Sequence, residues 1–393
     1  FLNIDTQKIN KNKITTYSYK TNNYIKGAFE FIFNFIAYFK TSNKTIFIKN
    51  SYINIKSILK LALFSKYKVK VRFNEGYSHE LSYKYNLETR KNFQDLLPES
   101  NEFELFLKTV LPFDLPMAMV ENYEHLNKLA KKYYQKKSPE IILSSSSWYY
   151  DELFKLWVAS SIGKSQLIGI QHGGNYGAIR YLREEHYERK IVDYFLTWGW
   201  GGHKDNNVIP FGSTKMINYK ESSLNSDDIL FVMTQKPKYF CDLRFIPHES
   251  ISYLENQEVF LKNISENLLR NFRIRPYPSE NQDKYINLWK VYNNNIKIDS
   301  KNVKFIDSLS NCKLYVVDHI ATTYLESLKM NIPTIIFLNK KYPNGLLSTS
   351  AFKEFKKLEE VGILYYSAKN AALAINRMQD DIDGWWFNQE VQN

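Results

Sequence analysis

The sequence predicts an α/β protein with two Rossmann-like domains, each built around a parallel β-sheet. In the first half, apolar runs at 141–143, 167–170 and 194–197 have the length of buried strands, and each ends in a polar or glycine-rich turn. From residue 226 to 345, a second series of apolar runs alternates with helical patterns. Such alternation is typical of parallel sheets, whose ligands bind at the carboxyl ends of the strands.

The 393 residues are enough for two domains. We expect an N-terminal domain over residues 1–205, a C-terminal domain over 226–345 and a closing segment, 346–393, that packs back towards the first domain. Residues 75–138 break the strand–helix rhythm and are expected to form a mostly helical insertion, with a Leu-Pro-Phe-Asp-Leu-Pro loop at 111–116.

In the first domain, apolar residues at helical spacing predict a helix over 22–40, and alternating charged and apolar residues predict a half-exposed strand over 68–73. The other expected elements here are a strand at 45–49 and helices at 53–64, 118–134 and 151–162.

A polar segment over 203–227 is expected to connect the domains. In the second domain the same patterns predict strands at 228–234, 272–275, 303–306, 314–317, 333–338 and 363–366. They predict helices near 250–270, 282–294, 322–330 and 368–379, and one that begins near Ser350.

The chain is basic, with a formal net charge of +12. Its basic residues are scattered, which favours an anionic substrate or an anionic membrane surface over nucleic acid as partner. Cys241 and Cys312 lie far apart, so we expect no disulfide framework and a reducing, cytoplasmic location. No apolar run approaches the ~20 residues of a membrane span.

The serines Ser144 to Ser147 follow the first buried strand, and Asp151 and Glu152 lie near the start of the next helix. Ser and Asp at such positions often cap helices, because their oxygens accept orphan backbone N–H groups. That structural role is an alternative for Asp151. Glu152 is a candidate general acid or base.

The tetrapeptide Gln171-His172-Gly173-Gly174 directly follows the second buried strand. It places an imidazole beside backbone that lacks side chains, so a phosphate or a sugar can approach closely. We therefore regard His172 as a catalytic candidate. The seven histidines do not cluster with cysteines or carboxylates at ligand spacing, and no metal is expected.

Two further motifs follow strands of the second domain. Arg273 and Arg275, with Tyr277 between two prolines, suggest an anion site, because guanidinium groups donate bidentately to phosphate or carboxylate. The alternative is a solvated basic strand edge.

The other motif runs from Asp318-His319 through Thr322 and Thr323 to Glu326. The threonines are placed to cap a helix, whose N-terminus would bind phosphate, or to serve as ordinary caps only. Glu326, one turn into the helix, is placed to accept from ribose hydroxyls. Signatures of P-loop NTPases, dinucleotide-binding enzymes, esterases and zinc sites are absent from the sequence.

Five motifs, taken in order, resemble those of a family of bacterial surface-polysaccharide transferases with the GT-B fold. They are SSSSWYYDE, QHGGNYG, DYFLTWGW, RIRPYP and DHIATTYLESLKMNIPTIIF. That family is similar to the retaining β-Kdo transferases of O-antigen and capsule synthesis, which use CMP-Kdo. The resemblance spans about residues 140–338. It implies two domains that face each other across a cleft, a nucleotide-sugar donor, a lipid-linked or oligosaccharide acceptor, no metal cofactor and peripheral contact with the inner membrane.

The resemblance also implies roles for residues. Glu152, Asp151 and His172 would be catalytic, with Asp193 and Asp242 as further candidates for a carboxylate nucleophile. The donor would contact Gln171, Gly173, Gly174, Arg273, Arg275, Tyr277, Asp318, His319, Thr322, Thr323 and Glu326. The chain departs from the family pattern at Ser279-Glu280-Asn281, where an Asp-Gly-Trp type continuation is expected.

Two alternatives remain open. A polyol-phosphate transferase with a CDP-linked donor would carry a second His-Gly motif in the C-terminal domain, whereas His319 is followed by Ile320. A non-catalytic module would bind polysaccharide or nucleic acid through aromatic and basic side chains, and its binding would depend on salt.

Overall fold

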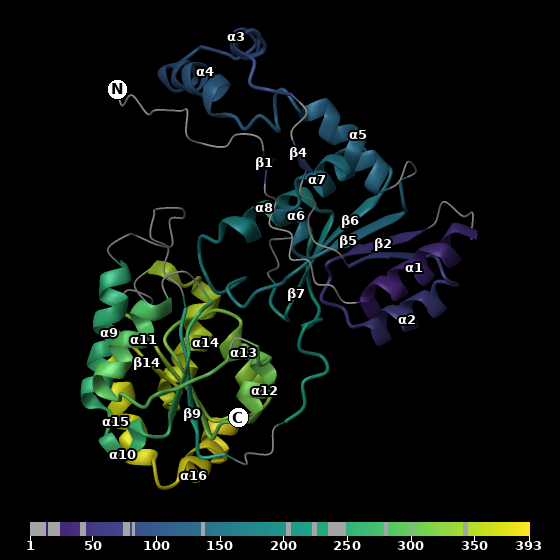
Figure 1. Ribbon diagram of the computed structural model, residues 1–393. Coiled ribbons are helices and arrows are strands. Elements are labelled where there is room, and N and C mark those ends of the chain that lie inside the picture. Colours follow the sequence, from purple (N-terminus) through teal and green to yellow (C-terminus); the bar gives the residue numbers. More distant parts are fainter. Residues whose placement is uncertain are drawn as a thin grey trace. The chain divides into compact units, whose positions relative to one another are not determined.

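The computed structural model describes residues 13–14, 24–39, 45–73, 79–80, 83–134, 138–201, 206–221, 226–234, 249–278, 282–300, 302–340 and 345–393. The chain divides into two units. The first comprises Phe1–His172 and Tyr187–Thr214, and the second Gly173–His186 and Lys215–Asn393. Each contains a six-stranded sheet with helices (Figure 1), which confirms the predicted α/β fold with two Rossmann-like domains. The predicted cleft stays a prediction.

The first sheet has the strand order β3-β2-β5-β6-β7-β8, and all of its pairings are parallel. Its strands are β2 (Ile46–Lys49), β3 (Val69–Arg72), β5 (Ile141–Ser144), β6 (Gln166–Ile170), β7 (Tyr194–Thr197) and β8 (Val208–Pro210). The strand β8 lies within the segment that was predicted to connect the domains. The boundary between the units falls after Thr214, inside this predicted segment.

Helices α1 (Tyr24–Phe39) and α2 (Ile55–Phe64) pack on the β2–β3 end of this sheet through Phe33, Ile58 and Ala62. The helix α1 also covers the edge strand β3. The Asn34 side chain donates to the Val71 carbonyl at 3.1 Å and accepts its N–H at 3.2 Å. This pairing satisfies backbone groups that an edge strand leaves open.

The predicted helical insertion is confirmed, and it contains α3 (Leu87–Asp95), α4 (Glu102–Asp114) and α5 (Tyr123–Tyr133). The loop predicted at 111–116 is wrong in its first part, because α4 continues through Pro112. Buried Arg90 explains how the helix can end there. Its guanidinium donates hydrogen bonds to the carbonyls of Pro112 and Leu115 at 2.7 and 2.9 Å, and it forms an ion pair with Glu121.

The short strands β1 (Lys13–Ile14) and β4 (His79–Glu80) pair with each other.

The second sheet has the order β11-β10-β9-β12-β13-β14, again with parallel pairings. Its strands are β9 (Ile229–Val232), β10 (Phe272–Arg275), β11 (Lys297–Ile298), β12 (Leu314–Val317), β13 (Thr334–Phe337) and β14 (Leu364–Tyr365). The strand predicted at 303–306 is wrong. This run leads into helix α12 (Phe305–Ser310), because four apolar residues do not distinguish a strand from a short helix.

The core of the second unit is aromatic where the helices meet this sheet. Phe260 stacks on Phe337 with ring centroids 5.1 Å apart, and Phe231 lies 4.6 Å from Trp289. The helices are α9 (Glu249–Asn263), α10 (Glu266–Leu269), α11 (Gln282–Tyr292), α13 (Thr323–Lys329), α14 (Thr349–Glu360), α15 (Ala368–Met378), α16 (Ile382–Trp386) and α17 (Gln389–Gln392). None of the helices in the described part of the chain could cross a membrane.

Residues 346–393 belong to the second unit, where β14 completes the sheet and α15 joins the core. Their predicted return towards the first domain stays a prediction. The segment Gly173–His186 also belongs to this unit, which the sequence pattern did not predict. The Arg180 N–H donates to the Leu346 carbonyl at 2.9 Å, and the Ser348 N–H donates to the Ala178 carbonyl at 2.9 Å. The Gln-His-Gly-Gly motif is therefore divided between the units after His172.

Candidate active site

In the first unit, an aromatic cluster lies at the carboxyl ends of β5 and β6. Tyr150 stands 4.9 Å from Tyr149 and 6.3 Å from His172 between ring centroids, and Tyr149 lies 5.7 Å from Tyr187. The Nε2 atom of His172 is 3.2 Å from Oε1 of Glu188, whose side chain is fully buried. This carboxylate, on α8 (Arg183–Ile191), fixes the imidazole ring at the end of β6.

Glu152 is linked to the same cluster through Lys155. It is the first residue of α7 (Glu152–Ala159), and its half-exposed carboxylate lies 2.6 Å from the Lys155 ammonium. Lys155 in turn lies over the ring of Tyr187, 5.8 Å from its centroid. The structure thus arranges Glu152 and His172 around one group of tyrosines, and their catalytic roles stay predictions.

Asp151 has a structural role, which confirms the capping alternative. One of its oxygens accepts the Phe154 N–H at the start of α7, at 2.9 Å. The other accepts the Tyr134 hydroxyl at 3.0 Å and pairs with the buried Lys49 ammonium at 2.7 Å. These contacts engage both oxygens, which argues against Asp151 as nucleophile or base.

Gln171 and Asp193 also hold the scaffold together. The Gln171 side-chain oxygen accepts the Trp198 N–H and the Trp200 indole N–H, at 2.8 and 2.7 Å, and so positions the loop after β7. Asp193 precedes β7, at the amino end of the sheet, and accepts the Leu167 N–H at 2.7 Å. It is therefore on the wrong edge for a nucleophile, since ligands of such sheets bind at the carboxyl ends. Asp242 lies outside the described residues.

In the second unit, two motifs that are far apart in the sequence meet beyond the carboxyl end of β12. The Gly174 N–H donates to the Thr322 hydroxyl at 3.1 Å. A Cβ atom at Gly174 would lie 2.4 Å from the Ala321 carbonyl oxygen, so this approach requires a glycine. The Thr322 side chain makes no capping bond to α13, contrary to the sequence prediction, because Thr322 has helical φ and ψ angles of −76° and −30° and not the extended backbone of a capping residue. The Thr323 hydroxyl is buried beside the phenol of Tyr315.

Asp318 and His319 lie at the centre of a buried polar network. The Asp318 carboxylate accepts the Tyr253 hydroxyl at 2.9 Å and the Gln257 amide at 2.8 Å, both from α9. Burial raises the pKa of Tyr253 well above its usual value, and the charge of Asp318 adds to this effect. The phenol therefore stays protonated and donates. Nδ1 of His319 lies 3.2 Å from Asp318, which fixes the imidazole so that Nε2 points away from the carboxylate.

Glu326 is buried on α13 and has two partners. Its Oε1 atom lies 2.9 Å from the Lys215 ammonium and 2.9 Å from the Tyr219 hydroxyl. Burial and the Glu326 charge raise the pKa of Tyr219, so this hydroxyl also donates. Sequence reasoning missed Lys215 and Tyr219 because they lie in a polar segment without a recognisable pattern. One oxygen of Glu326 is thus occupied, and ribose binding stays a prediction.

Arg273 and Arg275 do not form an open anion site. Arg273 pairs with Asp299 at 2.7 Å and donates to the carbonyls of Ser308 and Asn311. Arg275 also pairs with Asp299, and it donates to the Ser308 hydroxyl. Burial alone would raise the pKa of Asp299, but these hydrogen bonds and charges outweigh it and lower that pKa. The arginines therefore fasten α12 to β10, whereas Tyr277 is half exposed beyond the strand.

A family model matches the whole chain, residues 1–393. The chain belongs to the LIC12162 family transferases. It therefore catalyses a group transfer. None of the curated proteins matches the sequence.

Solved structures give weaker matches. The UDP-GlcNAc 2-epimerase from Methanocaldococcus jannaschii is 11% identical, with 88% of this chain and 96% of that chain covered and a TM-score of 0.45. The UDP-GlcNAc 2-epimerase from Neisseria meningitidis is 11% identical over 89% and 94%, with a TM-score of 0.38. WaaG, a glycosyltransferase of lipopolysaccharide biosynthesis, is 9% identical over 88% and 94%, with a TM-score of 0.35. The assignment to a transferase depends on the family match and not on these structures.

Within the described ranges of this family member, no three His, Cys, Asp or Glu side chains form a group suited to a metal ion. The residues that the structure adds to the predicted site are Lys215, Tyr219, Tyr253, Gln257 and Glu188. Only one signal in the sequence pointed to any of them. Tyr253 and Gln257 are a polar pair four residues apart, on one face of a predicted helix.

Proposed function

We propose that this transferase is a glycosyltransferase of bacterial cell-surface polysaccharide synthesis. It transfers a sugar, Kdo from CMP-Kdo, to a lipid-linked or oligosaccharide acceptor. The family match supports a transferase. The motif order described above supports the donor and the pathway class, and the chemistry of the second unit supports a nucleotide-sugar.

The observation that carries this proposal is the contact between Gly174 and Thr322. These residues are 148 positions apart, yet the Gly174 N–H reaches the Thr322 hydroxyl. Ala321 allows no side chain at position 174. The contact assembles the glycine motif and the Asp-His-Thr motif beyond the carboxyl end of β12, where parallel sheets bind ligands. This contact supports the proposal that the two motifs belong to one donor site in the second unit.

In our proposal, this site holds the donor nucleotide. His319, oriented by Asp318, donates from Nε2 to a phosphate oxygen of the donor. Lys215 adds positive charge beside Glu326 and so offsets negative charge that develops on the departing phosphate. Tyr277 contributes an exposed aromatic ring beyond β10. We do not assign Arg273 and Arg275 to donor binding, because both guanidinium groups form ion pairs with Asp299.

The first unit supplies groups for the transferred sugar and the acceptor. The bond from the anomeric carbon to the phosphate oxygen breaks, and its electron pair stays on the phosphate. An acceptor hydroxyl forms the new bond and gives its proton to a base. With Asp151 and Asp193 engaged structurally, Glu152 is the carboxylate that we assign to this step, as nucleophile of a retaining route or as base. We assign His172, whose ring lies beside Tyr150 of the tyrosine cluster, as the second acid–base group. The proposed route uses no metal.

The two alternatives are less well supported. A polyol-phosphate transferase would need a second His-Gly motif, and Ile320 stands where that glycine would be. A non-catalytic module does not agree with membership of a transferase family.

We further propose peripheral contact with the cytoplasmic face of the inner membrane. The net charge of +12 and the exposed Phe31, Ile32 and Phe35 on α1 favour an anionic lipid surface.

Calorimetric titration with CMP, CDP, UDP, GDP and ADP tests the proposed donor. We expect selective binding of CMP, at least ~10-fold weaker in His319→Ala, which corresponds to about 1.4 kcal/mol. His186→Ala is the matched control, because His186 is exposed on the same unit, and it should bind CMP as the wild type does. Preference for UDP or GDP would overturn the Kdo donor. Binding of none of the five at millimolar concentration would overturn the proposed function.

A further inference from the structure

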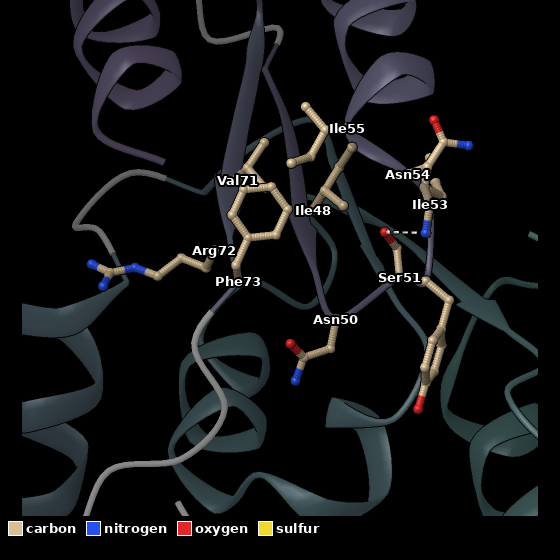
Figure 2. A pocket seen from close by; sticks show the side chains of 10 residues that line it. Ile48, Asn50, Ser51, Ile53, Asn54, Ile55, Val71, Arg72 and Phe73 are labelled. Atoms are coloured by element: carbon tan, nitrogen blue, oxygen red, sulfur yellow. Dashed lines mark hydrogen bonds between the residues drawn. The ribbon is translucent and has the colours of Figure 1, made fainter. Parts of the chain in front are cut away.

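A cavity of about 430 Å³ opens at the carboxyl ends of β2 and β3 in the first unit (Figure 2). This volume lies within the range of about 300–1,000 Å³ that is usual for small-molecule sites. None of the catalytic or donor-binding residues discussed above lines it. The residues that line it are Ile48, Asn50, Ser51, Tyr52, Ile53, Asn54, Ile55, Val71, Arg72 and Phe73.

The lining has an apolar and a polar part. Figure 2 shows the Phe73 ring beside Val71 and Ile48, while Asn50 and Ser51 lie towards the end of β2. The Arg72 side chain extends away from the apolar group in this view, and its guanidinium donates to the Tyr133 carbonyl at 2.5 Å. Apolar faces combined with amide and hydroxyl groups suit a neutral ligand that has both a hydrophobic face and hydroxyls.

The loop between β2 and α2 is strained. Asn50 and Tyr52 have φ angles of 45° and 56°, in the left-handed region. Asn tolerates this region, but it is uncommon for a bulky residue such as Tyr. Strained backbone persists only where the surroundings determine it, and it gathers at functional sites. Tyr52 therefore has a conformation that the fold maintains against a local cost, with its ring half exposed at the cavity.

Several hydrogen bonds hold this loop. The Asn50 carbonyl accepts the Ser145 N–H at 3.0 Å, and the Asn50 amide lies 3.3 Å from the Ser147 hydroxyl. The Ser51 hydroxyl accepts the Ile53 N–H at 3.3 Å. The cavity wall is thus preorganised, and it is tied to the serine run that leads into α7 and Glu152.

We infer that this cavity binds a neutral pyranose ring of the acceptor glycan. The apolar face of such a ring packs on aromatic and aliphatic side chains, and its hydroxyls bond to the amides and to Ser51. The position agrees, because β2 pairs with β5 and the two strands end side by side. This inference rests on the proposed function, since it names the class of the acceptor.

The test uses methyl glycosides of N-acetylglucosamine, galactose and rhamnose as probes, with binding followed by saturation-transfer NMR and calorimetry on the full chain. We expect the wild type to bind at least one of them, and Tyr52→Gly to bind it at least ~10-fold more weakly. Glycine relieves the positive φ, so the Tm of Tyr52→Gly should equal or exceed that of the wild type.

Tyr67→Gly is a matched control. Tyr67 also has a positive φ, 62°, but it lies after α2 and does not line the cavity. It should bind the glycosides as the wild type does. The inference is overturned if none of the glycosides binds, if Tyr52→Gly binds them unchanged, or if CMP displaces them from this cavity. Nucleotide binding without glycoside binding would contradict only this inference. Glycoside binding without nucleotide binding would contradict only the proposed function.

Discussion

Gly174→Ala is expected to abolish measurable CMP binding and to lower the Tm. Its Cβ atom would lie 2.4 Å from the Ala321 carbonyl oxygen and 3.0 Å from the Thr322 Cα atom, both of them backbone. Backbone at this distance cannot rotate away as a side chain does, so the segment after His172 must shift. The Gly174 N–H then loses its bond to Thr322. We expect a destabilisation of about 1–3 kcal/mol, as for other overpacked sites. Calorimetry with CMP and thermal unfolding measure the two effects.

Gly212→Ala is the control for this prediction. A Cβ atom at Gly212 would have no heavy atom of another described residue within 4 Å, and Gly212 has no assigned role in donor binding. We expect CMP affinity and Tm close to those of the wild type. Equal behaviour of the two variants would contradict the assigned role of the contact between Gly174 and Thr322.

Lys49→Met is expected to give the largest loss of stability, about 3–5 kcal/mol, because it leaves the Asp151 charge buried without its cation. The Lys49 side chain is fully buried, and its ammonium lies 2.7 Å from Asp151. The carboxylate also caps α7 and accepts from Tyr134. A shift of its geometry would therefore propagate to the helix that carries Glu152. Thermal unfolding followed by circular dichroism gives the shift in Tm.

Two further variants test whether the loss of stability comes from the buried, unpaired charge. Lys60→Met makes the same replacement at an exposed position of α2, and its Tm should stay near that of the wild type. The double variant Lys49→Met/Asp151→Leu removes both buried charges and should recover part of the loss. If Lys49→Met unfolds at the wild-type temperature, the ion pair does not stabilise the first unit.

The strands were the most predictable part of the fold. Tyr194–Thr197 and Phe272–Arg275 have the bounds that the sequence predicts. In these cases an apolar or alternating run ends at a glycine or proline turn, so the local pattern is sufficient. The strand β11 was missed because Lys297–Ile298 is too short and too exposed to leave such a pattern.

The partners of site residues were much less predictable. The motifs around His172, Asp318 and Glu326 were found from their positions after strands. Their contacts with Glu188, Tyr253 and Lys215 depend on tertiary packing, which no local spacing encodes. The same holds for Arg273 and Arg275. Their position after a strand suggested an anion site, but the buried carboxylate of Asp299 lies between them.

Sugar transfer itself tests the central claim most directly. We would measure CMP release and Kdo transfer from CMP-Kdo to membrane-derived glycan acceptors, with the wild type, Glu152→Gln and the exposed control Glu360→Gln. The account predicts transfer by the wild type and by Glu360→Gln, and a rate lower by about 10²–10⁴-fold in Glu152→Gln, the range for loss of an acid–base group. No transfer of Kdo by the wild type, or equal rates in Glu152→Gln, would contradict it.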